Sequence, residues 1–187
     1  MGVFISMTCA FGKSEDEVTK CLNEFFQLEN ENIGLTDIEV CTRNTSEENY
    51  KVTILYPSGF YKWDNASKYI SEKLKIPVFS FHIHDGDLWM YLFFEKGQLI
   101  DKFNPLPDYW DKISSEERKT WEGKPQVIAD KITGVEAFQI KKYLTNWDYD
   151  SALRKAYPQD EFENEAWQVI DFMDKLGFVY PSNDGIL

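Results

Sequence analysis

Both histidines of the chain fall in one short stretch, FHIHDGDLWM, at residues 81–90. On a β-strand, His82 and His84 project from the same face, where two imidazoles can share one metal ion. Asp85 or Asp87 could add an oxygen ligand. The sequence holds no third histidine, however, and its H-x-H-x-x-D spacing differs from that of metallo-hydrolases and cupins. We therefore predict no metal site and no cofactor at this stretch.

Other catalytic arrangements also lack support in the sequence. Asp101 and Asp108 could act as a carboxylate pair, but with 32 acidic residues some pairs lie close in sequence by chance. The same holds for Asp85 and Asp87, which a turn explains equally well. No G-x-S-x-G elbow, P-loop or G-x-G-x-x-G loop occurs. We therefore predict no catalytic residues and keep an enzyme as the alternative interpretation.

The histidine stretch is more simply interpreted as part of a β-hairpin. Residues 78–84 (VFSFHIH) and 88–94 (LWMYLFF) are rich in strand-forming residues, and Asp85-Gly86 between them is a two-residue turn signal. The second strand is apolar on both faces, which predicts an interior or doubly covered strand. Residues 99–103 (LIDKF) return as a third strand, so the segment is an antiparallel meander in which the histidines fill a partly buried sheet face.

The residues before the hairpin predict the elements that position it. Ser14 and Glu17 form a capping box before an apolar stripe of period 3.6, which predicts a helix over residues 15–29. A second helix is capped by Asp64 and ends before Pro77. Strands are expected at 3–11, 35–43, 51–57 and 78–84. The resulting order, β-α-β-β-α-β, is that of a ferredoxin-like sheet, which the meander then extends.

The remaining residues predict a group of short helices. One starts after Ser114, the next has Pro125 at its first position, a third covers 137–144, and the last covers about 160–176. No long Gly/Ser linker and no repeat occurs, so these helices should pack on the sheet. We predict one α+β domain over residues 1–187, with a sheet part at 1–104 and a helical part at 105–187.

Composition excludes several classes of function. The net charge is −12, which argues against binding to a phosphate backbone and so against a nucleic-acid partner. Residues 1–50 and 145–187 carry net charges of −7 and −6, whereas residues 51–144 carry +1. No apolar run is long enough to span a bilayer and no leader is evident, so we expect a cytoplasmic protein without a membrane partner. Three cysteines without a C-x-x-C pair are expected to be buried thiols.

One segment resembles a motif of uncharacterised bacterial proteins. It has a strand ending near D-x-D, then an I-D-x-F-N stretch, then P-D-Y and an aromatic residue, and finally WEGKP at residues 121–125. The matching residues are Asp85, Asp87, Ile100, Asp101, Phe103, Asn104, Pro107, Asp108, Tyr109 and Trp110. The resemblance covers about a quarter of the chain and implies a bacterial, cytosolic protein without implying an activity.

Two hypotheses of function follow. Trp63, Trp110 and Trp121 fall in expected loops or at helix starts, where they could anchor a protein interface together with His82, His84 and Asp87. With the acidic ends, this favours a non-catalytic interaction module that neutralises a basic partner such as a toxin domain, as an immunity protein does. The alternative is a small-molecule enzyme or sensor with His82 or His84 in a pocket between the sheet and the C-terminal helices.

Overall fold

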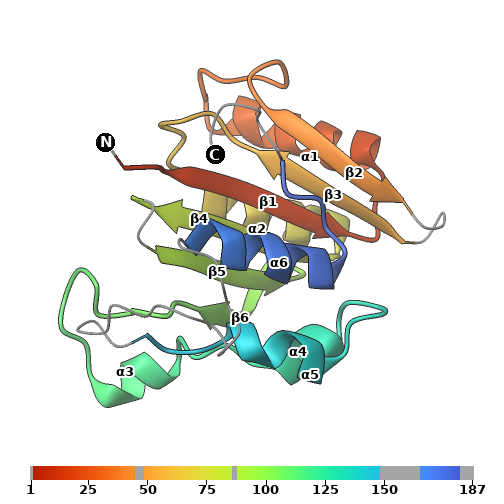
Figure 1. The fold of residues 1–187 in the computed structure, drawn as a ribbon. Helices are drawn as coiled ribbons and strands as arrows, with labels where there is room; N and C mark the ends of the chain where they lie inside the picture. The colour runs from red at the N-terminus through yellow and green to blue at the C-terminus, as the bar shows by residue number, and fades with distance from the viewer. Residues whose placement is uncertain (1, 45–48, 86–87, 148–164, 182–187) are drawn as a thin grey trace.

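A computed structural model describes residues 2–44, 49–85, 88–147 and 165–181. Within these residues the fold is mixed α and β, as predicted, and is built on one antiparallel sheet of six strands in the order β2-β3-β1-β4-β5-β6 (Figure 1). The strands are β1 (Ile5–Phe11), β2 (Glu39–Asn44), β3 (Tyr50–Leu55), β4 (Pro77–His84), β5 (Leu88–Glu95) and β6 (Gln98–Phe103). The sheet is not a simple meander, because β1 lies between β3 and β4.

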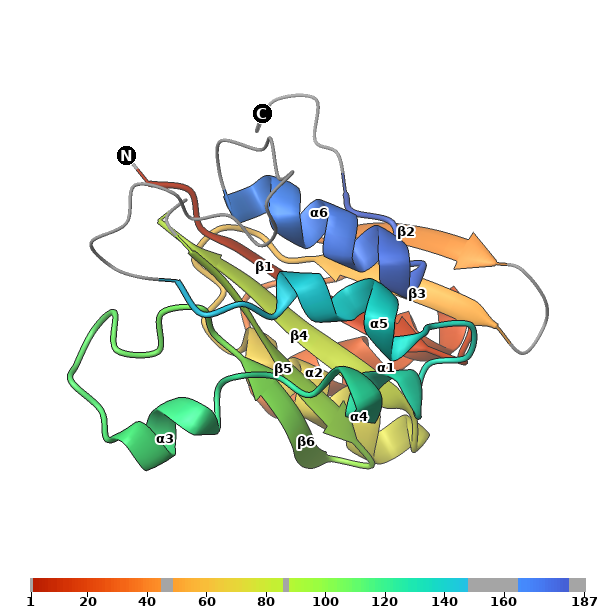
Figure 2. The same ribbon diagram turned by 60° about the horizontal axis from the view of Figure 1, so that its bottom comes forward.

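Helices cover both faces of the sheet. One face is covered by α1 (Glu15–Leu28) and α2 (Trp63–Leu74), and the other by α4 (Pro125–Ala129), α5 (Ala137–Ile140) and α6 (Glu165–Leu176) (Figure 2). Two short elements, α3 (Ser115–Lys119) and the 3-10 helix η1 (Lys141–Tyr143), lie in the connections. Among the described residues, no helix combines the length and apolar character that crossing a bilayer requires.

Two hydrophobic cores lie on opposite faces of the sheet, because successive strand residues point to opposite sides. Val78 of β4 packs with α1 and α2, whereas Phe79, Phe81 and Ile83 pack beneath α4, α5 and α6. On this second face the space between sheet and helices is filled by large side chains, which include Trp89, Tyr91, Phe103 and Phe172. The predicted covering of β5 on both faces is confirmed.

Several element boundaries differ from the predicted ones. The capping box of α1 forms as expected, with Ser14 as the N-cap. The predicted cap of α2 is wrong: the helix already begins at Trp63, and the Asp64 carboxylate accepts a hydrogen bond from the amide of the next residue. β2 begins only at Glu39, because Asp37 accepts a hydrogen bond from the Gly34 amide and holds the preceding residues in a turn. The start predicted near residue 160 for the last helix lies outside the described residues.

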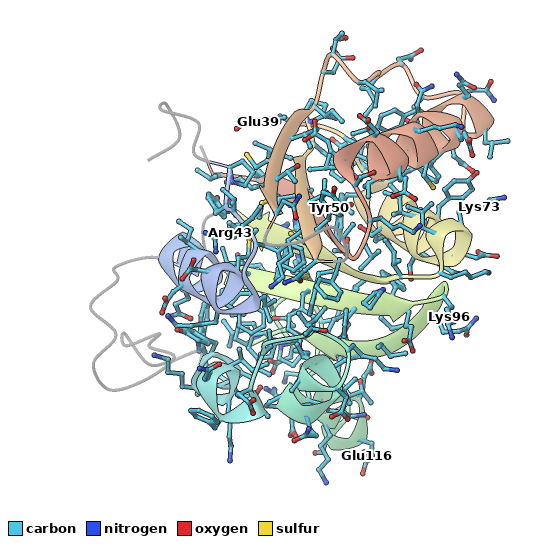
Figure 3. All side chains as sticks on the ribbon, turned by 90° about the vertical axis from the view of Figure 1, so that its right-hand side faces the viewer. Glu39, Arg43, Tyr50, Lys73, Lys96 and Glu116 are labelled. Atoms are coloured by element: carbon cyan, nitrogen blue, oxygen red, sulfur yellow. The ribbon has the colours of Figure 1, made fainter. Side chains whose placement is uncertain are left out.

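The C-terminal helix is fastened to the β2-β3 hairpin at its last turn. The buried Lys51 Nζ donates to the Leu176 carbonyl over 2.8 Å, where a cation also complements the helix dipole. Arg43 pairs with Asp174 over 3.2 Å, and Figure 3 shows the labelled Arg43 beside α6. Gly177 ends the helix with φ of 81°, which confirms its predicted place just past the helix end.

A buried carboxylate explains much of the I-D-x-F-N and WEGKP pattern. Asp101 Oδ2 accepts hydrogen bonds from the Tyr91 hydroxyl over 2.7 Å and from the Lys124 amide over 2.9 Å. Burial raises the pKa of Asp101, and these two hydrogen bonds oppose that rise. The backbone N–H of Asn104 donates to the Trp121 carbonyl over 3.0 Å. The pattern therefore fastens the segment after α3 to β6.

Replacing Gly123 by alanine should destabilise the protein more than the same change at Gly134. Both glycines have positive φ, at 72° and 84°, which costs alanine about 1–2 kcal/mol. A Cβ on Gly123 would also lie 2.9 Å from the Tyr91 hydroxyl and 3.0 Å from Leu144, whereas one on Gly134 meets nothing within 4 Å. At Gly123, this overpacking should add about 1–3 kcal/mol to the loss of unfolding free energy, which urea unfolding measures. Equal losses for Gly123→Ala and Gly134→Ala would contradict this close packing.

Candidate functional site

The two histidines face the side of the sheet covered by α2. His82 pairs with Ser6 in the β1-β4 register, and its Nδ1 lies 2.9 Å from the Ser6 hydroxyl. Its ring stacks on Trp63, the first residue of α2, with centroids 4.7 Å apart and planes 3° from parallel. His82 Nε2 lies 3.5 Å from His84 Nδ1. The structure thus brings Trp63 and both imidazoles together, on the face opposite α4, α5 and α6.

Aromatic rings surround His84 at the end of β4. Phe4 and Trp110 each meet the imidazole edge to face, with centroids 4.9 Å away, and Tyr109 lies at 5.9 Å. Phe4 and Trp110 are both 51% exposed. Single exposed apolar residues are common on protein surfaces, but a group of them is typical of an interaction site.

A cavity of about 330 Å³ opens beside the two imidazoles. It is lined by Phe4, Ser6, Pro57, Ser58, Gly59, Phe60, Tyr61, Trp63, His82 and His84. An adjoining cavity of about 310 Å³ shares Phe4, Pro57 and Ser58 and adds Asp37 and Glu39 to the lining. We call the two together the Phe4 groove. It is aromatic at the histidine end and acidic at the other, and no Lys or Arg of the described chain lines it.

The His82 side chain, which lines the groove, is uncharged at neutral pH. Burial, reinforced by the charge of His84, lowers the pKa of His82 to about 4, and a hydrogen bond with the Ile5 backbone opposes this shift only in part. The side chains of Ser6, His82 and His84 form a row that resembles a nucleophile, its base and an orienting group. A base with so low a pKa is poorly matched to deprotonating serine near pH 7. This row of three side chains therefore suits binding better than covalent catalysis.

The geometry of the described residues bears on the metal and carboxylate alternatives. Within the described ranges, no group of three or more His, Cys, Asp or Glu side chains is placed to hold a metal ion. Asp87, which could have been a ligand, lies outside the described residues. Asp101 and Asp108 have separate partners, since Asp101 binds Tyr91 and the Lys124 amide while Asp108 forms an ion pair with Arg118.

Trp121 is not part of the groove. Its ring lies beneath Lys102 of β6, with Nζ 3.9 Å from the ring centroid, and the neighbouring residue Glu122 bridges to Phe103. Trp121 is half-buried and supports the segment that follows α3. Of the three predicted tryptophan anchors, the structure brings Trp63 and Trp110 to the histidines and leaves Trp121 elsewhere.

Phe4 and Ser6 escape sequence reasoning, whereas Tyr61 does not. Phe4 was expected inside the first strand, but β1 begins at Ile5 and leaves the Phe4 side chain outside the core. Ser6 gains its place through the cross-strand register with His82, 76 residues away. Tyr61, 86% exposed, lies on the connection between β3 and α2, where the sequence SGFYKW does signal an aromatic loop.

Comparison with protein-family models, with curated proteins and with solved structures found no match for this chain. The resemblance to uncharacterised bacterial proteins therefore stays a prediction.

Acid should destabilise the fold through His82. The unfolded chain protonates this imidazole near pH 6.5 and the folded chain only near pH 4, so the stability that neutral His82 gives is complete above about pH 6.5 and is lost as the pH falls toward 4. Urea unfolding at about pH 7.5 and about pH 5 should show a larger loss for the wild type than for His82→Gln. The same loss in both proteins would show that His82 is not the group responsible.

Proposed function

We propose that this protein is a non-catalytic bacterial interaction module of the cytoplasm that binds and neutralises a basic protein, such as a toxin domain, in the manner of an immunity protein. The observation that carries the proposal is the group of exposed aromatic side chains, Phe4, Tyr61 and Trp110, around the groove that holds both histidines.

The aromatic residues supply the anchoring energy of such an interface. Large aromatic side chains that stay exposed in the free protein bury much apolar area on binding, and Trp and Tyr dominate the residues whose loss weakens interfaces most. Trp63 adds a half-buried ring whose position is fixed by stacking on His82. A rigid ring loses little side-chain freedom on binding, so the groove is prepared for a partner.

The charge of the groove fits a basic partner. Asp37 and Glu39 line its acidic end, and the protein as a whole carries −12. Lys62 follows Tyr61 directly in sequence, but it pairs with Glu29 over 3.0 Å and Glu31 over 2.7 Å. That pairing offsets its repulsion of a cation. An acidic surface speeds encounter with cationic proteins, and the aromatic rings then slow dissociation.

The alternative function is a small-molecule enzyme or sensor that uses His82 or His84. One observation favours it, because a cavity of about 330 Å³ with aromatic walls and a few polar groups has the size of a ligand pocket. Such a pocket would lie in the Phe4 groove, since the space between the sheet and the C-terminal helices is filled by buried rings such as Trp89 and Phe172. The low pKa of His82 argues against acid-base chemistry there.

We also propose that β1, α1, β2, β3, α2 and β4 form a ferredoxin-like unit. The strand order β2-β3-β1-β4 and the antiparallel pairing of β1 with β3 and β4 support this assignment. In this interpretation the groove lies where the connection from β3 to α2 crosses the ends of β1 and β4.

Removing two exposed rings should weaken partner capture. Immobilised wild-type protein should retain a basic protein from its native host at low salt and release it as the salt concentration rises. The double variant Tyr61→Ser with Trp110→Ser should bind that partner about 10-fold or more weakly, because each ring is an anchor of the interface. Affinity for the purified partner can be measured by calorimetry.

Phe138→Ser is the matched control for this experiment. Phe138 is also an exposed aromatic residue, at 77%, but it lies on α5 on the other face of the sheet. The control variant should bind like the wild type. Capture of no basic protein, or equal loss of affinity in the control and the double variant, would contradict the proposed function.

A further inference from the structure

We propose that the histidine end of the Phe4 groove receives an arginine side chain of the partner, with the guanidinium against the rings of Phe4, Tyr61 and Trp63 and the adjoining acidic end facing the surrounding positive charge. This inference rests on the proposed function and adds the chemical group that the site selects.

The walls of the cavity suit a flat cation. Four of the lining residues are aromatic, namely Phe4, Phe60, Tyr61 and Trp63. The negative face of an aromatic ring attracts a cation, and guanidinium also stacks on such rings because it is planar and weakly hydrated. A compact, strongly hydrated ammonium loses more solvation in the same space. The lining therefore favours arginine over lysine.

The polar groups at the floor can accept hydrogen bonds from guanidinium. Ser6 and Ser58 are among the residues that line the cavity, as are His82 and His84. A guanidinium carries five N–H donors and no acceptor, so it needs several such oxygen or nitrogen atoms. Because the pKa of His82 lies at about 4, this ring is neutral at physiological pH and does not repel the cation.

The charged groups near the cavity also favour a positive ligand. Asp37 and Glu39 line the adjoining end of the groove. Asp85 follows His84 in sequence and is exposed. Lys62, which lies between the lining residues Tyr61 and Trp63 in the sequence, forms ion pairs with Glu29 and Glu31. A cation bound in the groove would therefore be attracted by Asp37 and Glu39 at one end and would contact aromatic rings at the other.

The two histidines make a direct test possible. They are the only ones in the chain and both line the cavity, so imidazole resonances in an NMR spectrum report on this site alone. N-acetyl-L-arginine amide is titrated into the wild-type protein at constant neutral pH, beside N-acetyl-L-lysine amide and N-acetyl-L-citrulline amide. Citrulline has nearly the shape of arginine but no charge. We expect saturable shifts of both imidazoles with the arginine probe, weaker binding of the lysine probe and no response to citrulline.

Variants locate the bound probe. Phe4→Ser and Tyr61→Ser remove exposed rings and should each weaken arginine binding by about 2- to 5-fold, the value of one exposed cation–π contact. Glu39→Gln should weaken it in a salt-dependent way, because the loss is electrostatic. Phe138→Ser should leave the affinity unchanged, since this residue lies on α5 across the sheet.

The outcomes separate this inference from the proposed function. No imidazole shift with arginine, an equal response to citrulline, or equal effects of Phe138→Ser and Tyr61→Ser would overturn the arginine site. If a basic partner were still captured through Tyr61 and Trp110, the proposed function would stand without it. Arginine binding with the expected variant effects, but without any captured partner, would support the site and count against the interaction module.

Discussion

The alternation of side chains along β4 is the constraint on which the rest of the molecule depends. Phe79, Phe81 and Ile83 point into the larger core beneath the C-terminal helices, so the residues between them must point to the other face. There, Ser80 lies beneath the start of α2, and His82 and His84 continue the row toward the strand end. A shift of one residue in register would exchange three apolar side chains for three polar ones.

The polar side chains on this face of the sheet are tolerated because they have hydrogen-bond partners. A buried hydroxyl or imidazole needs a partner, and the neighbouring strand and α2 provide several. Thr8 lies 2.7 Å from the Tyr56 hydroxyl and 2.6 Å from that of Ser67, and the Ser67 hydroxyl donates to the Trp63 carbonyl over 3.0 Å. The network holds the first turn of α2 against the sheet. It thereby sets the position of the ring that stacks on His82.

Local pattern predicts the elements well and the site only in part. The helix over 15–28, the hairpin around residue 85 and the glycine that ends α6 each depend on residues close in sequence, so periodicity and turn chemistry suffice to find them. The start of β2 was predicted too early because the Asp37 turn competes with the strand pattern. Register and layer assignment depend on contacts between distant residues, which no single pattern contains.

The site shows where sequence reasoning stops. Both histidines and Trp63 were singled out because of their types, yet their meeting depends on the β1-β4 register and on the place of α2. Trp110 and Trp121 have similar settings in the sequence, but only Trp110 reaches His84, while Trp121 packs under Lys102. What distinguishes them is the path of the segment that Asp101 fastens to β6.

The two outer strands of the sheet also govern self-pairing between copies of the chain. An open strand edge can pair with another molecule and start aggregation. β2 carries Glu39 and Arg43, whose charges disfavour such pairing, and the Phe103–Glu122 bridge occupies one end of β6. These features limit growth of the sheet at its two edges, in a protein that keeps several aromatic side chains exposed.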